Sequence, residues 1–134
     1  MSPDLEVQGL VVQTLKADAA VTALVAGRVF DQVPKDAQFP YVSYGPSDVV
    51  EDDADCIDGL LVTFQIDAWS RTVGFPECKR ITDAVRRALH QRDLPLGVNA
   101  LVYLQHEITR TQRDPDGLTS HGIMTFEASV EQTP

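Results

Sequence analysis

The clearest hydrophobic pattern in the chain lies between Gly59 and Arg86, where a period of two gives way to a helical period. Alternate positions are apolar in the first part, which predicts a strand with one buried face made of Leu60, Val62, Phe64, Ile66 and Ala68. The apolar residues then recur at helical spacing, at Cys78, Ile81, Ala84, Val85, Ala88 and Leu89. The two patterns together predict a helix that lies across the sheet containing the strand.

Two further helical patterns precede this unit. Residues 4–17 predict an amphipathic helix capped by Ser2 or Asp4, with an apolar face formed by Val7, Leu10, Val11 and Leu15. Asp18 is the predicted N-cap of a short helix that runs to Ala26 and stops at Gly27, with Val21, Leu24 and Val25 facing inward.

The other extended patterns predict three more strands. Residues 28–38 predict a short extended piece and a loop, and residues 41–44 predict a strand that bends at Gly45-Pro46 and resumes at Val49-Val50. Residues 101–113 and 118–131 predict two long strands joined by a tight turn at Asp114-Pro115-Asp116-Gly117. In the strand at residues 101–113, alternation places four residues on one face: Val102, Leu104, His106 and Ile108. In the strand at residues 118–131, five alternating residues face inward: Gly122, Met124, Phe126, Ala128 and Val130.

The resulting order of elements is α-α-β-β-α-β-β in a single domain spanning residues 1–134. Hairpin-like connections between neighbouring strands favour a mostly antiparallel sheet of four strands. The apolar stripes of the helices require a partner, and one face of that sheet provides it. The predicted fold class is therefore α+β, a two-layer sandwich with the helices on one face.

Charge narrows the possible functions. The chain has 20 acidic residues against 11 basic ones, a net charge of −9, which argues against ordinary binding to nucleic-acid phosphates. Two explanations fit such a charge: it keeps the protein soluble, or it forms an acidic surface that DNA passes without adhering. Two cysteines, no visible signal peptide and no apolar run of about 20 residues favour an intracellular protein with reduced thiols and no membrane segment.

The acidic charge concentrates in residues 48–58, which include Asp52, Asp53 and Asp55. Calcium binding is one interpretation. However, Ile57 occupies the fifth position of the loop, glycine comes one place late and no distal glutamate is in register, so the spacing does not match an EF-hand. A solvated or partner-facing loop, mobile in the free chain, is the expected structure.

No motif in the chain predicts a catalytic, cofactor or metal site. There is no Gly-x-Ser-x-Gly elbow, Walker loop or dinucleotide fingerprint. Cys78 lies on an apolar helical stripe and is expected in the core, while negative neighbours disfavour a reactive thiolate at Cys56. His106 and His121 can approach each other across the predicted hairpin, but two ligands do not close a zinc site.

Charged residues also gather in two places outside the acidic loop. The basic residues on or just after the central helix are expected to form a solvated face: Lys79, Arg80, Arg86, Arg87 and Arg92. The hairpin turn carries both signs of charge, which suits ion pairs between subunits. The residues predicted to contact another subunit or a partner are Arg110, Arg113, Asp114, Asp116 and His121 near the turn, together with Asp52, Asp53 and Asp55.

The whole pattern resembles the small tail-completion family of tailed phages, prophages and gene transfer agents, long filed as a domain of unknown function. The resemblance rests on an N-terminal helix followed by residues 27–34 (GRVFDQVP) and 39–42 (FPYV). It continues through Ala68-Trp69-Ser70-Arg71, the following helix, and the spacing of Arg110, Arg113, residues 114–117 (DPDG) and His121-Gly122 in the final hairpin. Order and spacing carry the resemblance, because no single segment is diagnostic.

The resemblance implies a structural protein with no enzymatic activity and no cofactor. It implies a ring, typically of six subunits, at the head-proximal end of the tail tube, formed by a tail terminator or head–tail joining protein. The implied partners are further copies of the chain, the tail tube protein and a head-completion or connector protein, with DNA only as passing cargo and no membrane. The implied location is the tail of a virion or phage-like particle assembled in the bacterial cytoplasm.

In such a ring, neighbouring subunits contact one another through different surfaces. A subunit repeated around an axis makes heterologous contacts, and the long C-terminal hairpin with the edge of its sheet is a natural border for a neighbour. An alternative function is a monomeric tail-assembly chaperone or adaptor that leaves before the particle is finished. A further alternative is a small metal-dependent hydrolase that uses His106, His121 and nearby acids.

Overall fold

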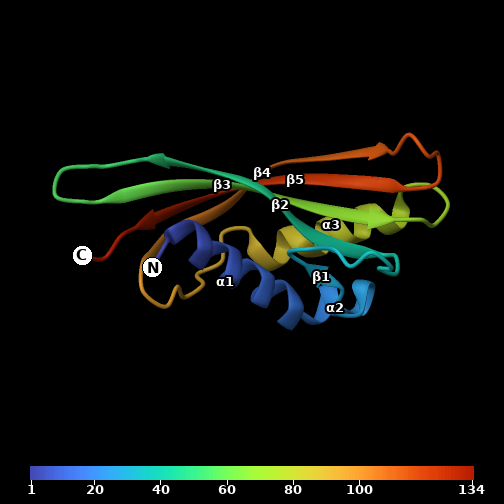
Figure 1. Cartoon of the computed structure of the whole chain (residues 1–134), viewed down its shortest axis with the longest axis horizontal. Coiled ribbons are helices and arrows are strands. Elements are labelled where there is room, and N and C mark those ends of the chain that lie inside the picture. Colours follow the sequence, from blue (N-terminus) through green and yellow to red (C-terminus); the bar gives the residue numbers. More distant parts are fainter.

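The computed structural model describes residues 1–134 as one sheet with helices packed on one of its faces (Figure 1). The elements, in chain order, are α1 (Pro3–Ala17), α2 (Ala19–Val25), β1 (Val29–Phe30), β2 (Tyr41–Glu51), β3 (Gly59–Ser70), α3 (Pro76–Leu89), β4 (Ala100–Arg113) and β5 (Ser120–Glu131). The predicted two-layer α+β arrangement is confirmed. None of the three helices has the length and apolar character needed to cross a membrane.

The sheet has five strands and is mixed, which corrects the prediction of a mostly antiparallel sheet of four strands. Its order is β1-β2-β3-β5-β4, and only β1 pairs in parallel with its neighbour. The short extended piece expected near residue 28 supplies β1, in which Val29 pairs with Val42 and is buried. A strand of two residues is too short to show alternation, so the sequence pattern could not separate it from a loop.

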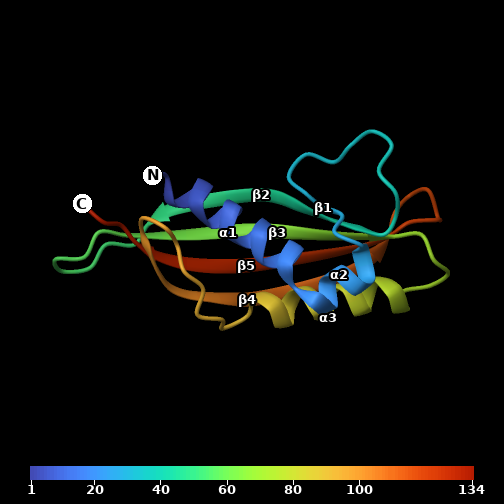
Figure 2. The same cartoon turned by 90° about the horizontal axis from the view of Figure 1, so that it is seen from below.

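β3 and β5 form the centre of the sheet in an unbroken antiparallel register from Gly59–Glu131 to Ser70–Ser120. The inward positions predicted for both strands are confirmed. On this inner face Phe64 stacks between Tyr44 and Phe126, with ring centroids 5.4 Å apart on either side. Figure 2 shows α1 crossing the strands obliquely while α3 runs alongside them, so the core lies between this aromatic stack and the two helices.

β4 departs from simple alternation because it contains two bulges. The register shifts between Leu101 and Tyr103 and again between His106 and Ile108. Each extra residue moves the following side chains to the other face. Leu104 is therefore buried as predicted and His106 faces inward, whereas Val102 is 62% and Ile108 44% exposed, which contradicts their predicted place on the same face.

Local chemistry accounts for the helix ends and for the close contact of α3 with the sheet. Ser2 and Asp18 accept hydrogen bonds from the N–H groups of Leu5 and Val21, at 3.3 and 3.0 Å, so the predicted caps are confirmed. A Cβ atom at Gly122 would lie 2.6 Å from Thr82 Cγ2. Only a glycine therefore allows α3 to approach β5 this closely.

Cys78 lies in this contact between α3 and β5, which confirms its predicted place in the core. Burial raises the pKa of its thiol to about 11, so the side chain remains a neutral thiol at neutral pH.

A carboxylate near the N-terminus holds the connection between α3 and β4. Glu6 accepts hydrogen bonds from the N–H groups of Val98 and Asn99 and from the Asn99 side chain, at 2.6, 3.0 and 3.0 Å. Two opposing effects act on the pKa of Glu6. Partial burial is the largest single effect and raises the pKa, but the hydrogen bonds from Asn99 and Val98 together have a larger effect in the other direction. The net result is a pKa below the ordinary value of 4.5.

We predict that Glu6→Gln destabilises the fold by about 1 kcal/mol or less at neutral pH, because an amide is a weaker acceptor and the site is partly exposed. The contribution of Glu6 is present above the unfolded-state pKa and is lost as the pH falls through the lowered folded-state pKa. Urea unfolding at about pH 7 and about pH 3 should therefore show a smaller difference between the two proteins at the lower pH. A constant difference would contradict this assignment.

We also predict that Phe64→Ala costs about 3–5 kcal/mol of unfolding free energy, because it removes the middle ring of the buried stack and leaves a cavity. The outward-facing neighbour offers the control, since Thr63→Ala should cost less than about 1 kcal/mol. Urea denaturation measures both. Similar losses in the two variants would mean that the inner face of β3 is wrongly assigned.

Candidate assembly surfaces

The helices cover one face of the sheet and leave its other face and both ends uncovered. In Figure 1 the β2–β3 turn projects beyond the rest of the molecule at one end, near both chain termini. The β4–β5 turn and the loop from β3 to α3 lie at the opposite end. The candidate functional residues are on these uncovered surfaces.

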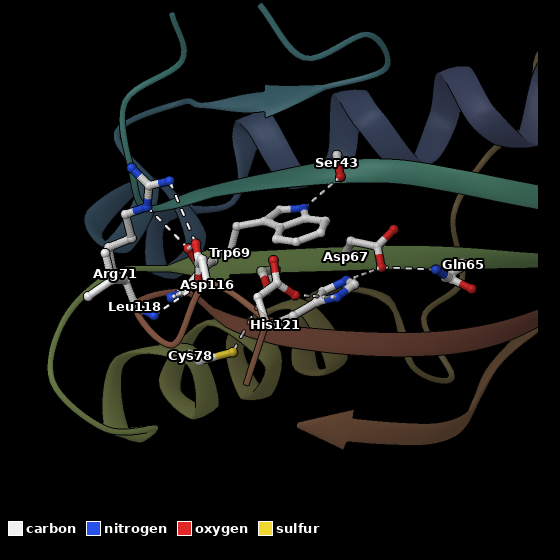
Figure 3. A network of polar contacts seen from close by, with 12 residues as sticks. Ser43, Gln65, Asp67, Trp69, Arg71, Cys78, Asp116, Leu118 and His121 are labelled. Atoms are coloured by element: carbon white, nitrogen blue, oxygen red, sulfur yellow. Dashed lines mark hydrogen bonds and ion pairs between the residues drawn. The ribbon is translucent and has the colours of Figure 1, made fainter. Parts of the chain in front are cut away.

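The uncovered face is braced by a polar and aromatic network next to the β4–β5 end (Figure 3). His121 Nε2 lies 2.7 Å from Asp67 Oδ1, and Gln65 Nε2 donates to the same oxygen at 2.9 Å. Trp69, which pairs with His121 across the strands, stacks on its ring with centroids 3.7 Å apart. The indole N–H donates to the Ser43 hydroxyl at 3.1 Å, which ties β2 to the same network.

Burial makes this network a structural brace rather than an open site. The side chains of His121 and Asp67 are only 13% and 9% exposed, and His121 Nδ1 lies 3.8 Å from Asp114 Oδ1. Gly45 provides room for the pair, since a Cβ there would lie 2.8 Å from Asp67 Oδ2. His121 was predicted to contact a partner, but both of its ring nitrogens already face carboxylates of its own chain.

The β4–β5 turn is held by Asp116. Its carboxylate accepts hydrogen bonds from the N–H groups of Leu118 and Thr119 and from the Thr119 hydroxyl, at 2.9, 2.9 and 2.7 Å. The bonds from Thr119 and Leu118 lower the pKa of Asp116. Gly117 has the positive φ of 71° that the turn requires, so the predicted turn chemistry is confirmed.

Two arginines border the same end and stand over aromatic rings. The Arg113 guanidinium lies 4.9 Å from the centroid of Phe75, and that of Arg71 lies 4.1 Å from the centroid of Phe39. Both line a pocket of about 270 Å³, which we call the arginine pocket; its other lining residues are Thr72, Val73, Gly74, Gly117, Leu118 and Ser120. Val73 and Leu118 are 99% and 70% exposed there, an unusual position for aliphatic side chains.

The acidic segment forms the projecting tip of the β2–β3 hairpin, which we call the acidic tip (residues 51–58). Asp52 N–H donates to the Gly59 carbonyl at 2.9 Å, and Ala54 and Ile57 pair as an antiparallel bridge. The segment expected as a mobile loop thus continues the hairpin ladder. Oxygens of Glu51, Asp53 and Asp58 lie within 4.8 Å of one another, so like charges are held close together in an exposed position.

The predicted contact residues therefore fall into separate groups. Asp52, Asp53 and Asp55 are exposed on the acidic tip, at the end of the molecule away from the β4–β5 turn. Arg110 pairs with the outward-facing Ile123, whereas Arg113 pairs with the inward-facing Ser120, so the two arginines lie on opposite faces of β4. Their role in contacts with other chains stays a prediction.

The expected approach of His106 and His121 does not occur. His106 faces inward and meets Phe126 at 5.4 Å between ring centroids, while His121 lies on the outer face opposite Gln112. The histidine that His106 meets is His90, whose Nδ1 accepts a hydrogen bond from the His106 backbone N–H at 2.9 Å. The pair proposed for a metal-dependent hydrolase is thus separated by the sheet itself.

Sequence reasoning missed Arg71, Phe75 and Asp67 as parts of these surfaces. Arg71 follows the end of β3, in a segment that carries the family resemblance, and this was the only feature of the sequence that pointed to a functional role for Arg71. The contact between Asp67 and His121 depends on the register of β3 against β5, which the printed sequence does not encode locally.

These features define a class of protein: a small α+β subunit with an open sheet face and two unlike, charged ends. The chain belongs to the family described as tail completion protein gp17, whose model matches residues 9–131.

The solved structures that resemble it include the following two, each over most of its length. A chain of the virion of a native gene transfer agent particle is 34% identical, with a TM-score of 0.86 over 92% of this chain and 93% of that chain. The gp17 protein of bacteriophage SPP1 is 21% identical, with a TM-score of 0.64 over 93% of this chain and 88% of that chain, and shares the fold. No curated protein sequence matches the chain.

We predict that Asp67→Ala lowers the free energy of unfolding by about 1–3 kcal/mol, because His121 and Gln65 lose a shared acceptor in a largely buried place. Gln65→Ala is the matched control and should cost less, since it leaves the pair of Asp67 and His121 intact. Thermal or urea unfolding compares the two variants. An Asp67→Ala protein as stable as the native chain would show that the network does not brace the sheet.

Proposed function

We propose that this chain is a structural subunit that completes the tail of a phage or gene-transfer-agent-like particle, as a tail terminator or head–tail joining protein. Several copies form a ring, of six in the expected case, at the head-proximal end of the tail tube. The partners are the tail tube protein and a head-completion or connector protein, and the lumen lets DNA pass. The subunit works within the particle and catalyses no reaction.

The observation that carries this proposal is the similarity to a chain of a native gene transfer agent virion. Identity of 34% across more than nine-tenths of both chains leaves no large insertion or missing region between them. Membership of the tail completion family agrees with the same role.

The shape of the subunit supports ring formation. Heterologous contacts join two different surfaces of neighbouring copies, and a ring closes when the rotation between them closes. The acidic tip and the arginine pocket are two such surfaces, at opposite ends of the molecule. By contrast, the free edge of β4 carries two bulges and the charged Glu107, devices that discourage strand addition. The hairpin ends are therefore better borders for a neighbour than the sheet edge.

The chemistry of the side chains supports a role without catalysis. His106 and His121 lie on opposite faces, and the nucleophile Cys78 is buried as a neutral thiol. His121 and Asp67 resemble part of a catalytic set, but the hydroxyl in their network, that of Ser43, is occupied by the indole of Trp69. The net charge of −9 suits a lumen that DNA must pass without adhering.

The experiment is electron microscopy of the purified chain with tail tubes of its own particle. We expect rings that cap one end of the tube. A chain that stays monomeric, alone at high concentration and with the tube, would contradict the proposal. Mass spectrometry of finished particles separates the alternative of a transient chaperone or adaptor, because a ring subunit remains in the particle and a chaperone does not.

A further inference from the structure

The two ends of the subunit differ in their exposed charged groups. The acidic tip, residues 51–58, contains five carboxylates and no basic residue. These five negative charges equal more than half of the net charge of −9 of the chain. The arginine pocket is lined by Arg71 and Arg113 and by no acidic residue. Figure 1 shows the β2–β3 turn, which forms the acidic tip, at one end of the long axis, and the β4–β5 turn and the β3–α3 loop, which line the arginine pocket, at the other end.

The acidic residues close to the arginine pocket are engaged within their own chain. Asp116 accepts three hydrogen bonds in the turn, Glu77 accepts one from the Ser70 hydroxyl at 2.7 Å, and Asp114 faces His121. The Arg113 guanidinium, in contrast, rests on the Phe75 ring and has no hydrogen-bond acceptor. Arg71 donates only its Nε–H, to Thr119, and approaches Asp116 no closer than 4.0 Å. Donors on both guanidinium groups therefore remain free for a carboxylate from outside the chain.

Most carboxylates of the acidic tip likewise have no hydrogen-bond partner within the chain. Of its five carboxylates only that of Asp53 accepts a hydrogen bond within the chain, from Gly59 N–H at 3.2 Å. The close approach of Glu51, Asp53 and Asp58 is repulsive in isolation, and a cationic partner relieves it. The tip also exposes Ile57, a match for Val73 and Leu118 at the border of the arginine pocket.

We propose that the acidic tip of one copy enters the arginine pocket of the next copy and that this contact repeats around the ring. The inference rests on the proposed function, because it needs a ring. It goes beyond it by naming the two surfaces that join neighbouring subunits. Charge sets the direction and register of each contact, while the apolar residues of the tip and the pocket supply contact area. Because both sets of charges are exposed in the free subunit, the contact weakens as salt rises.

A native cysteine makes the contact directly testable. Cys56 is exposed on the acidic tip, and Cys78 is buried, so oxidation reaches only the first. In the variant Leu118→Cys a second thiol lies at the border of the arginine pocket. We expect mild oxidation of assembled rings to give disulfide-linked oligomers up to the full ring in this variant. The matched control is Val98→Cys, which is also exposed but lies outside the pocket and should give no such ladder.

Charge reversal provides the second arm. Arg71→Glu with Arg113→Glu, or Asp53→Lys with Asp55→Lys, should each raise the concentration needed for ring assembly about tenfold or more, and an equal mixture of the two variants should restore assembly. If circular dichroism shows that the variant with both Arg71→Glu and Arg113→Glu is unfolded, the single variant Arg113→Glu replaces it in the assembly assay. The control, Arg80→Glu with Arg92→Glu, makes the same change of charge outside the pocket and should assemble normally.

The outcomes separate this inference from the proposed function. If the native chain forms rings but Leu118→Cys links no better than Val98→Cys and the charge variants assemble normally, the contact is wrong and the ring function stands. If the tip variant forms rings but no longer binds the tail tube, the tip contacts the tube and the inference is overturned. If the native chain forms no ring under any condition, both proposals fail.

Discussion

The register between β3 and β5 is the constraint on which the other features depend. Its twelve uninterrupted pairs place Phe64 opposite Phe126 on the inner face and Trp69 opposite His121 on the outer face. A slip of one residue would exchange the two faces and bury Asp67 among the helices. The stack of Tyr44, Phe64 and Phe126 favours the native register from the core side. The network around Asp67 favours it from the solvent side.

This central pair also determines what the molecule exposes. The three helices pack on one face only, so the hairpins extend past the helical layer at both ends (Figures 1 and 2). The β2–β3 turn carries carboxylates, and the β4–β5 turn lies beside two arginines. Neither set of charges contributes to the core. Their placement at the ends, where they meet solvent or another chain, is the feature that distinguishes this subunit from a generic two-layer fold.

The sequence predicted the parts of the fold that depend on local periodicity. The strand at Gly59–Ser70, the apolar stripe of α3, the caps at Ser2 and Asp18 and the turn at Gly117 all follow from residue type and spacing. The failures concern pairing over long separation in the chain. The bulges at Val102 and Glu107 and the parallel pairing of β1 arise from how strands meet, and no local pattern specifies them. For the same reason the sequence did not predict the contact of Asp67 with His121.

Charge placement connects the fold with the proposed ring. A subunit whose excess charge were spread evenly would repel every neighbour equally, and nothing in its electrostatics would favour one direction of contact. Here the strongest concentration of negative charge is on a hairpin tip, and guanidinium groups with free donors lie at the other end. Such an arrangement favours head-to-tail contact over head-to-head contact, because two acidic tips repel each other. Head-to-tail contact is the heterologous kind that closes into rings, and in the proposed ring the remaining negative charge would be free to face the lumen.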